Sequence, residues 1–334
     1  LGVVRARTDG DLQLIQLHAV GIGVGAPQDH AGQIDELFVV KGVHALLHFG
    51  GGRGADLRSG AALVVCRGEA MAQALFNIQN NYPGVHYLLF DGEPHNSSYT
   101  NYTTESNVHC VLFQEEQAGF LAGYAAVTDG YTQLGFIGAE EIPGVVRYVT
   151  GFLQGAEYAA EQQGLTVDLR TWFAGTYSAS DDTTNRMLDW CNNGTTLLFV
   201  NGGNLIASAI DAAKETTSGN EVRVMASDYD QNDSSDLILG SAIKCYNSAV
   251  QQELYAFFSG NAAWDQTVAG QSEKVGYTTG AVALAGPHWR FAELSQHDYE
   301  RLYTQLRNSD LKVDAYADMN TLPDTPNVTV EEQN

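Results

Sequence analysis

Short apolar runs alternate with longer amphipathic segments along most of the chain, beginning near residue 61. A short continuous apolar run bounded by turn residues is typical of a buried strand. The runs therefore predict strands at residues 61–66, 86–90, 108–113, 134–138, 196–201, 221–226 and 242–246.

The segments between these runs carry apolar residues every three or four positions, which is typical of helices packed on one face. In residues 204–216, for example, Leu205, Ala209 and Ala213 form one apolar stripe. Asn204 is placed to cap the first turn of this helix. Helices are predicted at residues 69–82, 115–127, 145–163, 182–191, 204–216, 249–259 and 297–307.

Strand–helix alternation of this kind is typical of βαβ units, in which helices cover both faces of a parallel sheet. The predicted fold class is therefore α/β with doubly wound parallel sheets. The length of 334 residues corresponds to about two domains, each large enough to bury a core.

The first 60 residues differ from the rest of the chain. They contain neither Tyr nor Asn, whereas the remaining residues hold all 16 Tyr and all 19 Asn. A strand is predicted there only at residues 45–49, so this stretch is poorly specified by its pattern.

Composition and charge exclude several functional classes. Hydrophobic residues make up 44% of the chain and charged residues 17%, which excludes a disordered chain. No apolar run approaches the ~20 residues that span a bilayer. The net charge of −23 disfavours nucleic acid as a partner and favours neutral over strongly anionic ligands.

The sequence provides no positive indication of enzyme chemistry or of a metal site. Its four cysteines lack C-x-x-C spacing, and we expect buried free thiols. Residues 21–26 fit the dinucleotide pattern G-x-G-x-x-[GA], but Pro27 and Asp29 interrupt the helix that should follow. Adjacent acidic pairs such as Glu115 and Glu116 are interpreted as a solvated face or a helix N-terminus. We therefore expect neither catalysis nor a cofactor.

Polar residues and glycines gather where three predicted strands end. In parallel sheets, ligands bind beyond these carboxyl ends. Carboxylates there can accept hydrogen bonds from a polyhydroxyl ligand, and glycines allow close approach of the backbone. Ordinary turn chemistry explains the same residues equally well. The three segments are Asp91-Gly92-Glu93, Asn201-Gly202-Gly203 and Ser227-Asp228-Tyr229-Asp230-Gln231.

Several longer motifs resemble one known family. Residues 114–126, QEEQAGFLAGYAA, resemble the E-E-G-S-F-L-A-G-Y-L-A helix of the basic-membrane-protein (BMP, PnrA-like) family of ABC-transporter substrate-binding lipoproteins. Residues 134–156 follow its block G-F-I-G-G-x-x-I-P-x-x-x-R-F-x-x-G-F-x-x-G. The resemblance covers about residues 61–285 and continues in GTY (175–177), SDYDQ (227–231) and SAIK (241–244).

The resemblance implies a type I periplasmic-binding-protein-like clamshell. Two doubly wound lobes joined by a multi-crossing hinge would hold the ligand, and closure would be a hinge motion. Residues 1–110 plus 247–285 would form lobe I and residues 111–246 lobe II, with crossings near 110–113 and 244–247. The C-terminal segment 286–334 is assigned to neither lobe.

The resemblance also implies roles for individual residues. Asp228 would bind ribose hydroxyls, with Asp230 as the alternative, and Asp91 would bind a polar edge of the ligand. Tyr177 would stack on a base, the alternative being an ordinary core tyrosine. Lys244 would either donate to the ligand or neutralise Asp228. Gly202 and Gly203 would allow the backbone to approach the ligand.

The N-terminal part departs from the family. Residues 32–38, GQIDELF, echo a family motif that supplies an acid, a stacking Phe and an Asn. Asp35 and Phe38 would take the first two roles, although Phe38 is one position early and the Asn and the lipobox cysteine are missing. We expect that part of residues 1–60 is strongly diverged or read out of frame. The start at Leu1 lacks signal-peptide features, so either a leader was removed or the chain starts partway into a gene product.

The expected function is that of an extracytoplasmic, membrane-associated binding component of an ABC importer. Its ligand would be a purine nucleoside or a similar small polar solute, its partner a membrane permease, and the chain a monomer. A clamshell-type sensor domain for signalling is the alternative, and an NAD-dependent enzyme is a weaker one.

Overall fold

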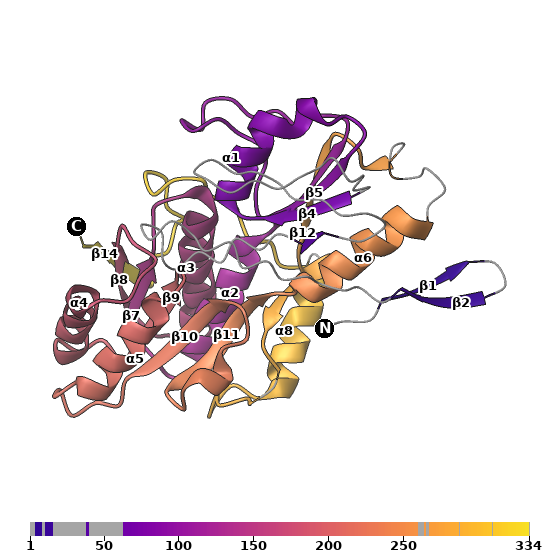
Figure 1. The fold of residues 1–334 in the computed structure, drawn as a ribbon. Helices are drawn as coiled ribbons and strands as arrows, with labels where there is room; N and C mark the ends of the chain where they lie inside the picture. Colours follow the sequence, from indigo (N-terminus) through magenta and orange to yellow (C-terminus); the bar gives the residue numbers. More distant parts are fainter. Residues whose placement is uncertain are drawn as a thin grey trace. The chain divides into compact units, whose positions relative to one another are not determined.

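The computed structural model describes residues 63–259, 264, 267–286, 288–308 and 310–333, together with the backbone of three strands at 4–8, 11–15 and 38–39 (Figure 1). The predicted strand 45–49, the glycine pattern at 21–26 and Asp35 lie outside the described residues, as does the side chain of Phe38. Β-strands β1 (Val4–Thr8) and β2 (Asp11–Ile15) pair antiparallel.

The described chain divides into two compact units, each formed by separate stretches of sequence. Unit 1 contains residues 63–113 and 246–274, and unit 2 contains residues 114–245 and 275–333. The family resemblance implied lobe boundaries at 110/111, 246/247 and 285/286. The two units divide at 113/114, 245/246 and 274/275. Residues 286–333, which the prediction assigned to neither lobe, lie in unit 2.

Unit 1 is built on a sheet with the strand order β12-β6-β5-β4-β3 within the described residues. The central strands β4, β5 and β6 are parallel, and β3 joins the β4 edge antiparallel. The elements are β3 (Phe38–Val39), β4 (Leu63–Arg67), α1 (Glu69–Ile78), the 3-10 turn η2 (Gln79–Asn81), β5 (His86–Phe90), β6 (Val108–Phe113), α6 (Tyr246–Ser259) and β12 (Gln271–Val275).

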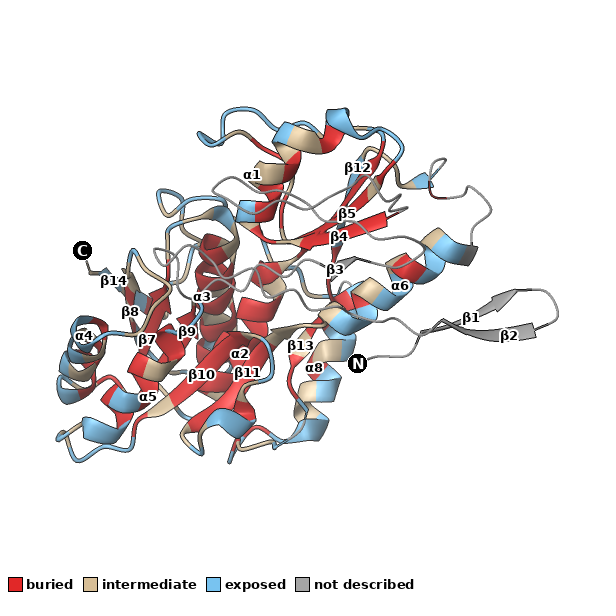
Figure 2. Cartoon of the chain, in the orientation of Figure 1, coloured by how far each residue is buried: buried red, intermediate tan, exposed pale blue. Residues whose placement is uncertain are grey.

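The two faces of this sheet are covered by different helices. Leu75 of α1 belongs to a buried cluster with Tyr87 and Leu89 of β5 on one face. On the other face, the rings of His86 on β5 and Phe257 on α6 meet edge to face, with centroids 5.2 Å apart. Burial on both faces explains why the sequences of β4 and β5 are almost continuously apolar (Figure 2).

Unit 2 is built on a sheet with the strand order β13-β11-β10-β9-β7-β8-β14 among the described strands. All neighbouring strands are parallel except β13, which joins β11 antiparallel. The elements are α2 (Glu115–Thr128), β7 (Gln133–Gly138), α3 (Pro143–Gln163), β8 (Val167–Phe173), α4 (Asp181–Asn192), β9 (Leu197–Asn201), α5 (Leu205–Glu215), β10 (Arg223–Asp228), η3 (Asn232–Ser234), β11 (Ile238–Lys244), η4 (Tyr277–Thr279), β13 (Val282–Leu284), α8 (Gln296–Arg307) and β14 (Val328–Glu332).

Helices cover both faces of the unit 2 sheet. Trp190 of α4 and Leu205 of α5 share a buried cluster with Val200 of β9 on one face. On the opposite face, the ring of Phe199 on β9 lies 5.0 Å from that of Phe152 on α3. This α/β/α layering confirms the predicted α/β class with parallel sheets.

Helices α2 and α3 pack unusually closely because glycines line their contact. A Cβ atom at Gly119 or Gly123 of α2 would lie less than 3.0 Å from backbone atoms of α3. A Cβ atom at Gly151 or Gly155 of α3 would likewise lie less than 3.0 Å from backbone atoms of α2. Small residues on both sides thus let the two backbones touch, which buries most of α2 in unit 2.

The predicted elements agree with the structure best where an apolar run is fully buried. Strands β5 and β6 have the predicted bounds. Strand β11 begins at Ile238, four residues before the prediction, and the sequence did not predict β8, β12, β13 or β14. Strand β8 alternates buried and exposed positions at the start, so it lacks the continuous apolar run that the prediction required.

Smaller expectations have mixed outcomes. Asn204 precedes α5 as predicted, but its side chain makes no capping hydrogen bond, so the predicted cap was wrong. Cys66, Cys110 and Cys191 are buried free thiols, whereas Cys245 is partly exposed. Burial raises the pKa of Cys66 to about 12, which keeps this thiol protonated. Within the described residues, no helix has both the length and the apolarity needed to cross a membrane.

We predict that Gly151→Ala strongly destabilises the protein. The new Cβ would clash with the backbone of α2 near Glu116, and backbone atoms cannot move aside as a flexible side chain can. Overpacking of this kind costs about 3 kcal/mol. Gly84→Ala is the matched control, because nothing lies within 4 Å of its Cβ position. Urea unfolding measures both variants, and similar midpoints for the two would contradict the assigned contact.

Candidate functional site

Each unit places an aspartate at the carboxyl end of a parallel strand in an uncommon backbone conformation. Asp91 follows β5 in unit 1 and Asp228 ends β10 in unit 2, with φ angles of 57° and 65°. Positive φ is uncommon for residues other than glycine, although Asp and Asn tolerate it better than most. Such a conformation at a strand end is a frequent feature of functional sites.

In unit 1, Asp91 is held by a cation and a tyrosine hydroxyl. The Nε of Arg67, the last residue of β4, donates to Asp91 Oδ2 at 3.2 Å. The hydroxyl of Tyr246, the first residue of α6, donates to the same oxygen. The Arg67 guanidinium also lies over the Tyr246 ring at 4.1 Å from its centroid. Phe113 packs edge to face on that ring at 4.8 Å.

Unit 2 surrounds Asp228 with the same kinds of group. Lys244 Nζ, at the end of β11, lies 3.4 Å from Asp228 Oδ1, and the Tyr148 hydroxyl donates to that oxygen at 3.3 Å. The Asn201 amide lies 3.5 Å from Oδ2 and donates to Ser227 Oγ at 2.7 Å. The side chain of Lys244 is only 8% exposed and that of Asp228 24%, so the carboxylate is the member that reaches solvent.

A second layer of charge lies behind Lys244. Glu115 at the start of α2 is 3.1 Å from Lys244 Nζ and accepts from Arg147 Nε of α3 at 2.7 Å. Glu116 is 4.0 Å from the same Arg147 nitrogen and accepts from the Gln114 amide at 3.2 Å. Both glutamates lie in the first turn of α2, as the helix N-terminus interpretation expected, but both are buried, so the alternative of a solvated face was wrong. The negative charges of the buried glutamates are compensated by Arg147 and Lys244. These cations are distant in sequence, so the adjacent pair of glutamates alone did not indicate them.

The buried position of Glu116 affects its protonation. Burial raises the pKa of the Glu116 carboxyl, and the Glu115 carboxylate adds to this effect, while Arg147 and Gln114 oppose it. The folded state therefore favours the protonated form relative to the unfolded chain. This stabilising contribution is present at low pH and is lost as the pH rises through the folded-state pKa.

Tyr177 lies beside the residues that follow β7 and β9. Its side chain is partly buried against the hydrophobic cluster that contains Trp190 and Leu205. Its hydroxyl donates to Glu140 Oε2 at 3.4 Å. Its carbonyl accepts from the Asn204 backbone N–H at 2.8 Å. These contacts are compatible with both interpretations of Tyr177, as a stacking residue and as a structural one.

The two glycines after β9 differ in their surroundings. A Cβ at Gly202 would lie less than 3.0 Å from Ala139, so internal packing alone requires glycine there. Gly203 is exposed and has a φ of 51°. Gly203 is thus the one of the two whose exposed backbone remains suited to ligand approach.

In unit 2 the structure brings together Asp228 and Lys244, which were candidate site residues in the sequence, with Tyr148 and Glu115, for which the sequence indicated no role at the site. In unit 1, Arg67 and Tyr246 contact Asp91, and the sequence did not indicate either of them. Tyr148 and Glu115 lie inside the motif blocks at 134–156 and 114–126, so the signal was present but carried no role. The tyrosine Tyr246 has no motif, and only the fold places it beside Asp91.

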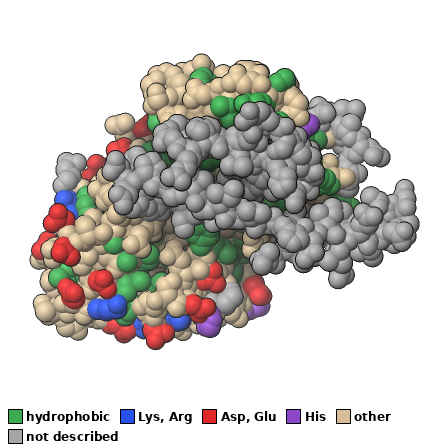
Figure 3. Space-filling view, viewed as in Figure 1, with side chains coloured by type: hydrophobic (Ala, Val, Ile, Leu, Met, Phe, Trp, Pro, Cys, Tyr) green, Lys and Arg blue, Asp and Glu red, His purple; other side chains and the backbone are tan. Residues whose placement is uncertain are grey.

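The surface charge agrees with the composition. On the face of unit 2 seen in Figure 3, acidic side chains are scattered around α4 and α5 (lower left), with Lys and Arg among them. The carboxylates of Asp91 and Asp228 are each paired with a cation, Arg67 and Lys244 respectively.

Comparisons with known proteins give a family match. The sequence model described as "ABC transporter substrate-binding protein PnrA-like" matches residues 57–313. An uncharacterized lipoprotein of Pyrococcus abyssi (strain GE5 / Orsay) is 26% identical over 157 residues, which cover 46% of this chain and 37% of that protein. The chain spans little more than a third of the length of this curated relative.

Solved structures share the fold at low sequence identity. A solute-binding protein of an ABC transporter system from Aeropyrum pernix K1 has a TM-score of 0.60 at 17% identity, covering 78% of this chain and 79% of that one. A similar protein from Conexibacter woesei DSM 14684 has a TM-score of 0.57 at 16% identity, covering 78% and 81%. A transcriptional activator of the comK gene from Bacillus halodurans has a TM-score of 0.55 at 19% identity, covering 79% and 81%. These likenesses confirm the type I periplasmic-binding-protein-like fold.

We predict that Glu115→Gln and Glu116→Gln change the free energy of unfolding in different ways. Glu115→Gln removes a carboxylate from two cations, one of them buried, and should destabilise the protein by about 3 kcal/mol at neutral pH. Glu116→Gln removes an acid whose ionisation burial opposes, so its stability relative to wild type should rise between about pH 5 and about pH 8. Urea unfolding at both pH values measures the two effects. A pH-independent difference for Glu116→Gln would contradict the assignment.

Proposed function

Because the chain belongs to the family of PnrA-like ABC transporter substrate-binding proteins, we propose that it binds a purine nucleoside or a similar neutral, hydroxyl-bearing solute for uptake. The family consists of binding proteins and not of enzymes. The proposed partner is an ABC permease, the proposed location is extracytoplasmic and membrane-associated, and the proposed state is a monomer.

The observation that carries this proposal is the matched pair of strand-end aspartates. Asp91 and Asp228 each accept a tyrosine hydroxyl and face a cation, and each keeps part of its surface exposed. A carboxylate fixed in this way still has lone pairs that can accept hydrogen bonds from ligand hydroxyls. Two hydroxyls on adjacent carbons, as in ribose, can both donate to one carboxylate.

The charges favour a neutral ligand over a phosphorylated one. Arg67 and Lys244 are each engaged by a carboxylate, so neither contributes an uncompensated positive charge to a phosphate. A phosphate near Asp91 or Asp228 would also be repelled by the carboxylate. We therefore propose a nucleoside and not a nucleotide as the ligand.

Lys244 is proposed to position Asp228 and not to donate to the ligand. Its ammonium lies near two carboxylates, and its side chain is almost fully buried. Tyr177 is proposed to stack on the base, because its backbone is hydrogen-bonded to Asn204 just after β9 and its side chain is only partly buried.

A second candidate function is a small-molecule sensor. It is favoured by the fold shared with a protein named as a transcriptional activator. Both candidates require ligand binding, so the binding experiment tests what they share. Specific association with a permease in membranes would separate the importer from the sensor.

We predict that the full chain binds inosine, adenosine or guanosine and that Asp228→Asn and Asp91→Asn each weaken binding at least about ten-fold. Asn keeps the side-chain size and tolerates positive φ, whereas the loss of a charged acceptor costs about 1.5–3 kcal/mol. Titration calorimetry with these nucleosides, ribose, free bases, AMP and NAD measures the affinities. Asp182→Asn, in the exposed first turn of α4, is the neutral control.

Several outcomes would contradict the proposal. If Asp230→Asn weakens binding and Asp228→Asn does not, the ligand-binding acid has been assigned to the wrong residue. Binding of AMP tighter than that of adenosine would contradict the argument from charge. A response to NAD alone would favour a nucleotide-binding protein instead.

A further inference from the structure

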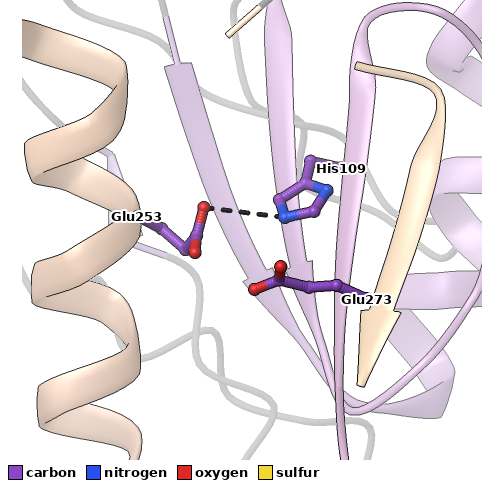
Figure 4. A group of neighbouring side chains, drawn as sticks. All are labelled: His109, Glu253 and Glu273. Carbon is purple, nitrogen blue, oxygen red and sulfur yellow. Dashed lines mark ion pairs between the residues drawn. The ribbon is translucent and has the colours of Figure 1, made fainter. Parts of the chain in front are cut away.

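Three side chains of unit 1 converge at a place that the proposed function does not use. His109 lies on β6, Glu253 on α6 and Glu273 on β12, and Figure 4 shows Glu253 pointing from its helix toward the imidazole. One ligand atom from each residue lies within 4.8 Å of the other two. These residues are far apart in sequence, so no motif spacing could have revealed the group.

The imidazole of His109 is almost fully buried, with 1% of its side chain exposed. Its Nδ1 is 2.9 Å from the carbonyl oxygen of Gln271, so this nitrogen carries the proton and donates it. Its Nε2 has no hydrogen-bond partner among the described residues. A backbone carbonyl that fixes Nδ1 and leaves the Nε2 lone pair available is the usual arrangement around metal-binding histidines.

The groups that face Nε2 are acceptors as well. Glu253 Oε2 lies 3.6 Å from Nε2, which is too long for a hydrogen bond. In a tetrahedral zinc site, metal–ligand distances of about 2.0–2.2 Å place two ligand atoms about 3.4 Å apart. The observed separation is therefore close to that of two ligands that share one ion.

Another histidine of unit 1 shows what an ordinary His–Glu pair looks like in this protein. His95 is equally buried, but its Nε2 lies 2.9 Å from Glu69 Oε2 and its Nδ1 lies 2.7 Å from the Asn96 carbonyl oxygen. Both of its nitrogens are thus hydrogen-bonded. His109 differs because its outer nitrogen faces two carboxylates without a hydrogen bond.

We propose that His109, Glu253 and Glu273 bind a divalent transition-metal ion, best matched by Zn²⁺. One imidazole and two carboxylates supply three ligands, and water would complete a tetrahedral set. Glu253 and Glu273 keep part of their surfaces exposed, which gives the ion a route from solvent. A bound ion would link β6, α6 and β12 and thereby fix α6 on the sheet.

The protonation behaviour of the group agrees with this assignment. Burial lowers the pKa of His109, although the Gln271 and Val268 carbonyls and Glu273 oppose this, so the imidazole is neutral and suited to bind a metal. Burial and the neighbouring Glu273 raise the pKa of Glu253 to about 7. A cation between the carboxylates would relieve the repulsion between them.

The test uses the full chain, stripped with EDTA and titrated with ZnCl₂ by calorimetry in excess Mg²⁺. Mg²⁺ occupies weak surface carboxylates but does not favour an imidazole ligand. We expect one tightly bound Zn²⁺ per chain and a higher melting temperature with zinc. Glu273→Gln and Glu253→Gln should each weaken zinc binding at least about ten-fold. Glu69→Gln, which alters the His95 pair, is the matched control and should bind zinc like wild type.

Co²⁺ provides a second measurement that does not depend on stability. Bound to wild type, it should give the intense visible absorption of a tetrahedral site, and the Glu273→Gln protein should lack this absorption. Equal zinc affinity in wild type and both variants would overturn the proposal, because the ion would then sit elsewhere on the acidic surface. Absence of binding at about 100 µM zinc would also overturn it and would leave a proton shared by the two carboxylates as the explanation.

Discussion

The close contact between α2 and α3 is the constraint on which the architecture of unit 2 depends. Gly119 and Gly123 on one helix meet Gly151 and Gly155 on the other, and no side chain fits between the backbones. This spacing brings the first turn of α2 against the first turns of α3. Glu115 therefore meets Arg147, and Tyr148 of the same turn reaches the end of β10. A packing requirement thus determines where the polar groups of unit 2 lie.

The polar groups placed in this way form a chain of alternating charge. Arg147 pairs with Glu115, Glu115 with Lys244, and Lys244 with Asp228. Burying charges is expensive, and a buried pair adds little net stability compared with apolar residues of the same size. Its advantage is geometric, because each charge holds the next in one position. This series of ion pairs ends at Asp228, the one of these four residues that has a positive φ angle. The ion pairs therefore hold in place the carboxylate that is proposed to bind the ligand.

The sequence predicted much of the fold because buried parallel strands leave continuous apolar runs. It also predicted that Asp91 and Asp228 lie where strands end, since those strands end at recognisable turns, whereas their role in ligand binding stays a prediction. It failed where the determining contact joins distant segments. Arg67 and Tyr246 meet at Asp91 from opposite ends of unit 1 in sequence, and nothing in either neighbourhood indicates the other. The same reason explains why Glu115 and Glu116, which look like a solvated helix start, are buried: their compensating cations lie on α3 and β11.

In both units the strand-end aspartate is held by the same two kinds of group, a cation and a tyrosine hydroxyl. A carboxylate that is proposed to accept hydrogen bonds from ligand hydroxyls has to lose water on one side and still be held in place by the protein. In each unit a cation lies beside the carboxylate, and a tyrosine hydroxyl donates a hydrogen bond that replaces part of the lost water. Positive φ turns the side chain at the end of the strand, which costs about 1–3 kcal/mol and persists only where surrounding contacts enforce it. Those contacts come from Arg67 and Tyr246 in unit 1 and from Lys244 and Tyr148 in unit 2. Because the residues differ while the roles coincide, the recurring feature is the chemistry of a fixed, compensated carboxylate, and that chemistry suits a neutral ligand with paired hydroxyls.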